Sequence, residues 1–427
     1  MDQLGVLPAH LAPCTAQVDT TGELTIGGLS VSALVELYGS PLFIYDEEHL
    51  RAQMRASAQG FGQGQVIYAS KAFPAVAMAR IVAQEGLFWD AASLGELHAA
   101  LRGGIEPAKI VLHGNNKSME ELSAAIEAQV GRLVVDSFDE IDRLEQLGTS
   151  RATRVWLRVT PGVEAHTHAY VRTGQQDSKF GFNLANGDAH RAIARVMASP
   201  RLSLTGLHCH IGSQVFALDS FRDAVAIMAE LTLESGLDEL CVGGGFGVAY
   251  LRDEHVPSVG AWTGWLREAL CAHGLQEEQI FVEPGRAIVA ASAVTVYTVG
   301  VIKRIPEVRT YVAVDGGMSD NPRPVLYGSG YEAFVPTRLF APHDATVALV
   351  GKHCESGDVL VREARLPSDL SVGELVMTPV TGAYGYSMGS NYNRLPRPAV
   401  ILVRDGRARI IVRRETLDDL FRLEADV

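Results

Sequence analysis

Apolar and polar positions alternate along the chain in two different ways. Between about residues 47 and 290, short apolar runs of strand length alternate with amphipathic stretches of helical period, which is typical of parallel βαβ units. The apolar runs lie in segments 65–70, 87–93, 109–115, 132–137, 154–160, 204–213, 240–247 and 280–286. Eight such units in about 245 residues predict a TIM-type (β/α)8 barrel. The absence of a Rossmann glycine fingerprint disfavours an open doubly wound sheet.

Outside this region the pattern predicts a second, β-rich domain. After about residue 291, strand-like segments follow one another with few helical stretches, and Asp405-Gly406 between two apolar runs predicts a hairpin. The lead-in contains a short helical pattern that ends at Gly39 and a strand-like run at 42–46. We therefore expect an α/β chain in which 47–290 forms a (β/α)8 barrel. A mostly antiparallel β domain, built from 1–46 and 291–427, should contribute to the active site.

Composition and charge narrow the classes of function. Hydrophobic residues make up 47% of the 427 residues and charged residues 20%, which is typical of a globular protein. The net charge of −13 argues against a nucleic acid or an anionic membrane as partner. The start of the chain lacks the pattern of a secretory signal, and Ala287–Ile302 is too short and too β-branched for a membrane span.

The five cysteines are scattered along the chain and include no C-x-x-C pair. This distribution predicts neither a structural metal site nor a redox dithiol. We expect a cytoplasmic protein with reduced thiols and no metal.

The candidate chemistry is centred on Lys71, in the stretch VIYASKAFP at 66–74. Lys71 follows an apolar run and precedes a helical pattern, so it should lie at the carboxyl end of the first barrel strand. Active sites of (β/α)8 barrels lie at this end. We interpret Lys71 as the amine that holds an aldehyde cofactor as a Schiff base. Other polar or glycine residues at predicted strand ends are Asp90, Arg158, His210, Gly245, Glu283 and Arg286.

Two glycine-containing turns follow the last two barrel strands, GGGFG at 243–247 and EPGR at 283–286. Barrels of this type often bind phosphate at these two loops, where backbone N–H groups can approach an anion. A lysine, a phosphate site and a carboxylate in one barrel mouth predict pyridoxal 5'-phosphate. Glu283 would keep the ring nitrogen protonated. His210 would stack on the ring, Ser213 would donate to the phosphate, and Asp90 and Glu96 would hold neighbouring groups in place.

An ordered set of motifs then points to a family. The motifs are YASKAF (68–73), HCHIGSQ (208–214), GGGFG, EPGR, SDNPRPVLYG (319–328), CESGD (354–358) and GAYGYSMGSNYN (382–393). Together they resemble the fold-type III pyridoxal-phosphate decarboxylases, in which a barrel is followed by a β domain. Within that family the set is most similar to the branch that acts on diaminopimelate. The resemblance extends from about residue 42 to about residue 400.

The resemblance implies a role for each matching residue. It makes Lys71 the Schiff-base lysine and Cys354 the acid that protonates the substrate carbon after carbon dioxide leaves. The expected cofactor-binding residues are Asp90, His210, Ser213, Gly245, Glu283, Gly285, Arg286 and Tyr384. The expected substrate-binding residues are Arg286, Arg323 and Tyr327 for the distal carboxylate, Glu355 for the distal amino group, and Tyr384. In this family the equivalents of Cys354 and Glu355 reach the site from the partner subunit, which implies a homodimer with shared active sites.

The implied reaction is decarboxylation of a small amino acid, meso-2,6-diaminopimelate, at its D-centre to give L-lysine and carbon dioxide. A paralogous decarboxylase for another diamino or carrier-linked amino acid is the alternative, because Pro324 and Tyr331 could reshape the distal pocket. A racemase with a similar fold would carry an arginine instead of Glu283. A non-catalytic cofactor-binding protein would lack the β domain. A metal-dependent hydrolase using His208 and His210 is the least favoured alternative.

Overall fold

The computed structural model describes residues 4–147, 151–163 and 177–425, and the chain divides into two compact units. The β unit comprises Met1–Ala52, Ala249–His255 and Val289–Val427. The barrel unit comprises Gln53–Val248 and Val256–Ile288. Helix α2 (Glu47–Phe61) contains the first boundary between them.

The barrel unit is built on a closed ring of eight parallel strands in the described chain, as the sequence predicts. These strands are β5 (Gln65–Ala69), β6 (Phe88–Ala91), β7 (Ile110–Leu112), β8 (Arg132–Val135), β9 (Thr153–Thr160), β11 (Leu202–His208), β12 (Glu239–Cys241) and β13 (Ile280–Val282). Pairing of β8 with β9 and of β13 with β5 closes the ring, and the short β10 (Phe182–Asn183) pairs with the end of β9.

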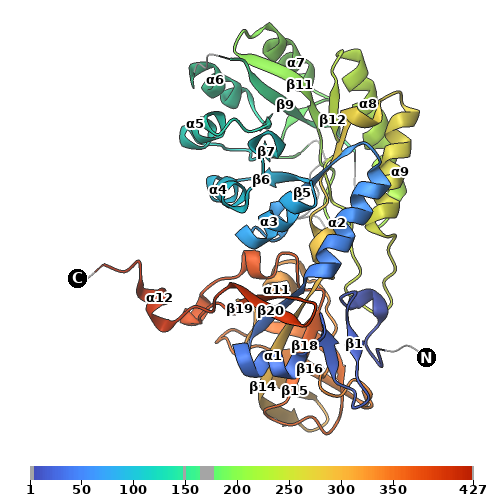
Figure 1. Ribbon diagram of the computed structural model, residues 1–427, viewed down its shortest axis with the longest axis vertical. Coiled ribbons are helices and arrows are strands. Elements are labelled where there is room, and N and C mark those ends of the chain that lie inside the picture. The colour runs from blue at the N-terminus through green and yellow to red at the C-terminus, as the bar shows by residue number, and fades with distance from the viewer. Residues whose placement is uncertain (1–3, 148–150, 164–176, 426–427) are drawn as a thin grey trace. The chain divides into compact units, whose positions relative to one another are not determined.

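Helices on the outside of the ring connect the strands (Figure 1). They are α3 (Val76–Gln84), α4 (Leu94–Gly103), α5 (Met119–Glu127), α6 (Phe138–Leu147), α7 (Asp188–Ala198), α8 (Arg222–Glu234) and α9 (Val259–Ala272), and the short α10 (Arg286–Val289) follows β13. Local sequence fixes several of their ends. The Ser93 hydroxyl accepts a hydrogen bond from the Glu96 N–H at the start of α4, and Gly104 ends that helix in the left-handed conformation.

The strands are apolar over nearly their whole length because both of their faces are covered, by the barrel interior on one side and the helices on the other. One interior cluster takes a side chain from each of six strands. Its members are Ile67, Val111, Val134, Trp156, Cys241 and Phe281, all of them 2% exposed or less. All of the predicted strand segments except 154–160 extend past the ends of the strands, because their last residues leave the ring to form the loops that carry the candidate site.

A polar cluster around Glu239 lies where strands β8, β9, β11 and β12 begin. The Glu239 carboxylate accepts hydrogen bonds from the Arg132 guanidinium (Nε to Oε2, 3.0 Å), the Trp156 indole (2.7 Å) and the Thr205 hydroxyl (2.7 Å). The Arg132 guanidinium also lies over the Phe281 ring, 4.6 Å from its centroid. The arginine charge is therefore enclosed between an aromatic layer and a single carboxylate.

Replacing Glu239 by alanine is expected to lower the free energy of unfolding by about 3–5 kcal/mol, because Arg132 would stay buried without its counter-charge. Glu239→Gln, which can still accept hydrogen bonds, should cost less. The exposed Glu234, at the end of α8, provides the matched control as Glu234→Ala. Chemical denaturation of the three variants measures the effect. A loss of less than about 1 kcal/mol for Glu239→Ala would contradict this role.

The β unit contains one large sheet with the strand order β17-β16-β15-β14-β4-β19-β20, and β18 pairs with β14. The strands are β4 (Leu42–Asp46), β14 (Ala293–Ile305), β15 (Arg309–Val314), β16 (Ala345–Val350), β17 (Val359–Leu366), β18 (Leu375–Pro379), β19 (Ala399–Arg404) and β20 (Arg407–Val412). All pairs are antiparallel except β15 with β16 and β4 with β19, so the sheet is mostly antiparallel, as expected.

The lead-in belongs to this unit, because β4 lies between β14 and β19. A small antiparallel sheet of β1 (Gln17–Val18), β2 (Leu24–Ile26) and β3 (Leu29–Ser30) precedes helix α1 (Val31–Tyr38), which ends at Gly39 with a φ of 72°. The predicted hairpin is present between β19 and β20. Asp405 and Gly406 both have positive φ there, 49° and 70°, as a tight turn of this kind requires.

Two further helices of the β unit are short, α11 (Arg323–Tyr327) and α12 (Leu417–Phe421). No helix among the described residues has the length and apolar character that a membrane span requires.

Candidate active site

Lys71 lies just beyond the end of β5, in a 3-10 turn formed by Ser70–Ala72. The side chain is exposed, whereas Ser70 and Ala72 on either side are buried. Its ammonium group interacts electrostatically with Asp90, His113 and His210. The structure therefore places Lys71 among buried ionisable groups at the carboxyl ends of the strands, as predicted.

Asp90 is the third residue of β6 and is 2% exposed. Burial raises the pKa of its carboxyl group, although the nearby His113 and Lys71 favour the ionised form. Its Oδ1 atom has no hydrogen-bond partner among the described residues. Glu96, in the first turn of α4, accepts a hydrogen bond from the Ala92 N–H at 2.7 Å and so holds the loop that follows β6.

Glu283 follows β13 and lies between two histidines. Its Oε1 is 2.9 Å from Nε2 of His113, and its Oε2 is 3.0 Å from Nε2 of His208. Burial would by itself favour the neutral acid, but the two imidazoles hold the pKa of Glu283 well below its usual range. The carboxylate is therefore ionised in the folded protein.

The motifs in the sequence predict no role for His113 and no cofactor role for His208. His113 directly follows β7, so the rule that collected polar residues at strand ends would have found it. The same rule applies to Asp136, directly after β8, whose carboxylate lies 3.9 Å from the Arg158 guanidinium.

His210 and the loop after β12 are in direct contact. Nδ1 of His210 accepts a hydrogen bond from the Gly244 N–H at 3.2 Å. Burial, together with repulsion from Lys71 and Arg158, lowers the pKa of His210 well below the usual value, so the ring is neutral. Its hydrogen bond to the loop fixes the orientation of the ring.

The glycines of the 243–247 turn have a packing role. A Cβ atom on Gly244 would lie 2.1 Å from the Glu283 carbonyl oxygen, and one on Gly245 would lie 1.9 Å from that of Gly212. A side chain at either position would separate the loops that follow β11, β12 and β13. Ser213 lies in the first of these loops, Gly285 in the last, and Arg286 begins α10.

The remaining predicted site residues belong to the β unit. Arg323 begins α11 and is 4% exposed. Its Nη1 contacts the hydroxyls of Tyr250 and Tyr331, and Nη2 donates to the Ser329 hydroxyl at 3.0 Å. The Tyr250 ring lies 4.5 Å from the guanidinium carbon. The Nε of Arg323 has no partner among the described residues, so its N–H is available to donate a hydrogen bond to an anion.

Tyr327 and Tyr384 lie in the same unit as Arg323. Tyr327 is the last residue of α11. Tyr384 lies within electrostatic range of Arg323, and its φ of 60° is unusual for a residue with a side chain. Such left-handed backbone costs free energy and is found preferentially at functional sites.

Cys354 and Glu355 are on an exposed loop between β16 and β17. The buried pair of His353 and Asp358 anchors the loop, with Nδ1 of His353 2.9 Å from Oδ2 of Asp358. The Cys354 N–H donates to the side-chain oxygen of Asn393 at 3.0 Å. The backbone is therefore held in place while the side chains of Cys354 and Glu355 are exposed.

Asp320, near the start of α11, is buried and accepts a hydrogen bond from the Gly317 N–H at 2.9 Å. Burial, with repulsion from Asp315 and Asp358, raises the pKa of Asp320 from 3.8 to about 7. The folded protein binds this proton more tightly than the unfolded chain, so the stability it contributes is complete below about pH 4 and is lost as the pH rises to about 7.

Asp320→Asn should remove this dependence. The melting temperature of the variant, relative to the wild type, is expected to rise as the pH increases from about 4 to about 7 and then to level off. Thermal melts over this range measure the difference. A difference that stays constant with pH would show that Asp320 does not titrate in this window.

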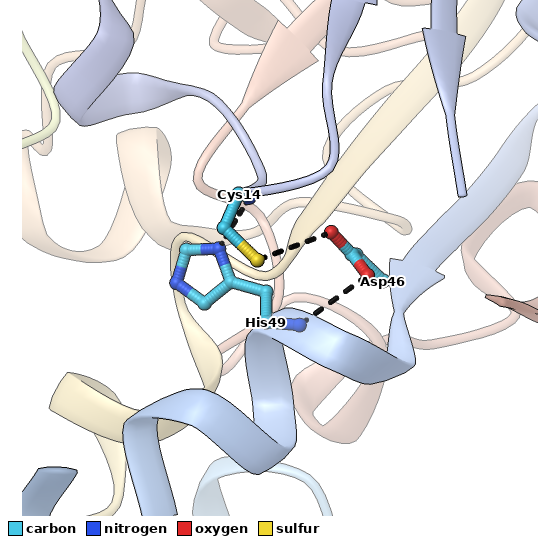
Figure 2. A group of neighbouring side chains, drawn as sticks. All are labelled: Cys14, Asp46 and His49. Atoms are coloured by element: carbon cyan, nitrogen blue, oxygen red, sulfur yellow. Dashed lines mark hydrogen bonds between the residues drawn. The ribbon is translucent and has the colours of Figure 1, made fainter. Parts of the chain in front are cut away.

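A separate group of ligand-type side chains, Cys14, Asp46 and His49, lies in the β unit (Figure 2). The Cys14 N–H donates to Nδ1 of His49 at 2.9 Å, and Oδ2 of Asp46 accepts from both the N–H and the hydroxyl of Thr15, at 3.0 and 2.8 Å. Burial and the adjacent Asp46 raise the pKa of the Cys14 thiol to about 12. We interpret the group as an anchor that attaches residues 14 and 15 to the start of α2.

The residues around Lys71 fit pyridoxal 5'-phosphate by the chemistry of their side chains. A reachable amine, an ionised buried carboxylate and a neutral imidazole lie together at one end of the barrel, as the aldehyde, the ring nitrogen and the ring face of this cofactor require. His113, His208 and Glu283 also have the donor types of a metal site, with ligand atoms within 4.8 Å of one another. These three side chains contact one another instead: His208 Nε2 and Glu283 Oε2 form a hydrogen bond of 3.0 Å, and His113 Nε2 lies at ion-pair distance, 2.9 Å, from Oε1.

Comparisons with known proteins agree with this chemistry. Residues 47–290 match the family model described as the pyridoxal-binding domain of pyridoxal-dependent decarboxylases. Diaminopimelate decarboxylase of Bacillus subtilis is 44% identical over 434 residues, which cover 96% of this chain and 97% of that protein. The enzyme of that name from Mycobacterium tuberculosis strain H37Rv is 41% identical and covers 99% of this chain and 100% of that protein.

Solved structures show the same architecture. Diaminopimelate decarboxylase of M. jannaschii in complex with L-lysine has a TM-score of 0.89 at 29% identity, covering 97% of this chain and 98% of that one. The Helicobacter pylori enzyme in complex with L-lysine has a TM-score of 0.84 at 31% identity, covering 92% and 98%. On the strength of its own site chemistry and of these near full-length similarities, the chain belongs to the pyridoxal-dependent decarboxylase family, in the branch of the diaminopimelate decarboxylases.

Proposed function

We propose that the protein decarboxylates meso-2,6-diaminopimelate at its D-centre and releases carbon dioxide and L-lysine. The observation that carries the proposal is the set of ionisable residues around Lys71, of the types that a pyridoxal decarboxylase needs. The relatives of known name and the lysine complexes of the solved structures support the choice of substrate.

The barrel residues serve the cofactor. When bound, pyridoxal 5'-phosphate supplies an electron-accepting ring that stabilises negative charge at the substrate carbon. The amine of Lys71 would hold the aldehyde, with loss of water, and Glu283 would pair with the ring nitrogen. His210 would cover the ring, and Asp90, whose Oδ1 has no hydrogen-bond partner among the described residues, would hold neighbouring groups in place. Ser213, Gly245, Gly285 and Arg286 would hold the phosphate.

The substrate is held at the end that does not react. Arg323 and Arg286 bind the distal carboxylate together with Tyr327, because guanidinium groups can make paired N–H bonds to a carboxylate. The unpaired, buried Nε of Arg323 supports this role. Glu355 binds the distal amino group, and Tyr384 contacts both cofactor and substrate. Recognition of both distal groups selects a substrate with an amino-acid group at each end.

Cys354 donates the proton that replaces carbon dioxide at the substrate carbon. We propose that both Cys354 and Glu355 act in the active site of the partner subunit, within a homodimer. There Cys354 gives the proton and Glu355 binds the distal amino group. The exposure of both side chains on an anchored loop supports this arrangement. We also place the enzyme in the cytoplasm, since its five cysteines are free thiols, as a reducing compartment favours.

Mixing two inactive variants tests the shared site. If sites combine residues from both subunits, dissociated and reassociated Lys71→Ala and Cys354→Ala chains should regain up to about a quarter of the wild-type activity, because half of the dimers are mixed and one of their two sites is intact. If each subunit carries a complete site, mixing restores nothing.

The reaction itself is tested by carbon dioxide release from a panel of meso-diaminopimelate, L-lysine and L-ornithine. Preference for meso-diaminopimelate, with L-lysine formed in equal amount, is the expected result. Preference for ornithine or lysine would assign the protein to a paralogous decarboxylase. Lysine formation without carbon dioxide would reject decarboxylation.

A further inference from the structure

Two histidines from different strand ends lie on either side of Glu283. His113 and His208 come from different strands, β7 and β11, and their rings meet edge to face with centroids 4.8 Å apart. The backbone N–H of His113 donates to the Ala91 carbonyl at 2.7 Å, and the backbone N–H of Glu283 donates to the Gly243 carbonyl at 2.8 Å. These backbone hydrogen bonds fix the chain at His113 and Glu283 to the neighbouring strand ends.

All three side chains are buried. His113 is 7% exposed, His208 1% and Glu283 5%. A buried carboxylate with no counter-charge would take up a proton, because a low dielectric disfavours its ionised form. The contacts with His113 and His208, at 2.9 and 3.0 Å, therefore favour the ionised form of Glu283 in the protein without a ligand.

The two histidines contribute unequally. Burial disfavours a charged imidazole at His113, but attraction to Glu283 and Asp90 outweighs it and raises the pKa of His113 above the usual value. Burial lowers the pKa of His208 to about 4 despite the same carboxylate. His113 is thus the histidine that favours the cationic form beside Glu283, and His208 favours the neutral imidazole.

Other charged groups also act on this cluster. The positive charges of Lys71 and Arg158 disfavour protonation of His113 and His208, respectively. The negative charge of Asp90 favours protonation of His113. These neighbours lie on β5, β9 and β6 or directly after them, and they surround Glu283 with both signs of charge. Within 4 Å of the carboxylate, the basic groups of the described residues are His113 and His208, and the Cys241 thiol also interacts with it.

The state of Glu283 has a chemical consequence. An ionised carboxylate accepts a hydrogen bond from a protonated ring nitrogen and favours the proton on the ring, whereas a neutral carboxylic acid would donate to an unprotonated ring. The two states differ in how strongly the ring withdraws electrons.

We propose that His113 and His208 are positioning residues that form a clamp on Glu283, which keeps its carboxylate ionised and oriented for the protonated ring nitrogen of pyridoxal 5'-phosphate. This inference rests on the proposed placement of Glu283 opposite that nitrogen. Oε2 is hydrogen-bonded to His208, whereas Oε1 is paired with His113 by charge and keeps its hydrogen-bonding capacity for the ring. The clamp therefore presets the electron-accepting form of the cofactor without touching it.

The clamp is tested by reconstituting wild type, His113→Leu and His208→Leu with pyridoxal 5'-phosphate labelled with ¹⁵N in the ring. The wild-type resonance should be that of a protonated ring nitrogen. His113→Leu should move it toward the unprotonated value, with a smaller shift for His208→Leu. His190→Leu, at an exposed position on α7, is the matched control and should leave the resonance unchanged.

An unchanged resonance in His113→Leu with cofactor bound would overturn the clamp. His113→Gln, which keeps an N–H donor without the charge, replaces the leucine variant if that protein does not fold, and it should shift the resonance in the same direction. Glu283→Gln separates the two proposals. If it moves the resonance while neither histidine variant does, the clamp fails and the placement of Glu283 stands. If it does not move the resonance, the placement itself is wrong.

Discussion

Replacing Lys71 by alanine is expected to abolish decarboxylation, with turnover lower by roughly 10³-fold or more, and to remove the visible absorbance of the covalently bound cofactor. Lys71 is the exposed amine among the buried groups at this end of the barrel, and a methyl group can form no bond to the aldehyde. The folded barrel should survive, because the side chain is not part of the core.

Absorbance spectra before and after borohydride, followed by peptide mapping, measure this directly. In the wild type the reduced cofactor should be found on the peptide that contains Lys71. Lys303→Ala, at an exposed position of β14, is the control and should keep both absorbance and activity. A Lys71→Ala protein that still retains reducible cofactor would show that another amine makes the bond.

Cys354→Ala is expected to keep the cofactor but to lower turnover by about 10²- to 10⁴-fold, the range for loss of a positioned acid. The thiol would give its proton to the carbon that has lost carbon dioxide, and solvent would then restore the thiol. Because Cys354 is exposed, the alanine variant should fold normally, and a loss of turnover would not reflect a folding defect.

Cofactor absorbance and turnover should be measured on the same preparation. Cys271→Ala, on helix α9, is the matched control and should behave as the wild type. Loss of cofactor absorbance in Cys354→Ala would indicate a structural role, and near-normal turnover would remove Cys354 from the chemistry.

The barrel could be predicted from the sequence because its strands and helices carry strong local patterns. The apolar runs that form β5 and β8 are buried almost throughout, and helices α4 and α5 begin at the capping residues Ser93 and Ser118. The hairpin at Asp405 and Gly406 has an equally local signal.

Contacts between distant residues could not be predicted in this way. Nothing near Glu239 in the sequence reveals that Arg132, 107 positions earlier, needs its charge. Similarly, the tyrosines that hold Arg323 come from residue 250 and residue 331. Such pairs depend on which loops and strands the fold brings together, which periodicity does not specify.

For the same reason, some site residues could be predicted from the sequence and others could not. Lys71, His210 and Glu283 lie in recognisable motifs, whereas His113 has only its position after an apolar run, and its 2.9 Å contact with Glu283 depends on the fold. The glycines of the 243–247 turn predicted a phosphate loop, but the structure shows that close packing alone requires at least Gly244 and Gly245.

The position of β4 between β14 and β19 has a consequence for synthesis on the ribosome. β4 emerges near the start of translation, but its parallel neighbour β19 spans Ala399–Arg404 and appears only near the end. Until then one edge of β4 offers unsatisfied backbone groups to any other extended chain. A nascent chain that stalls or terminates before residue 399 should therefore depend on chaperones or be degraded, even though the whole barrel segment has already been translated.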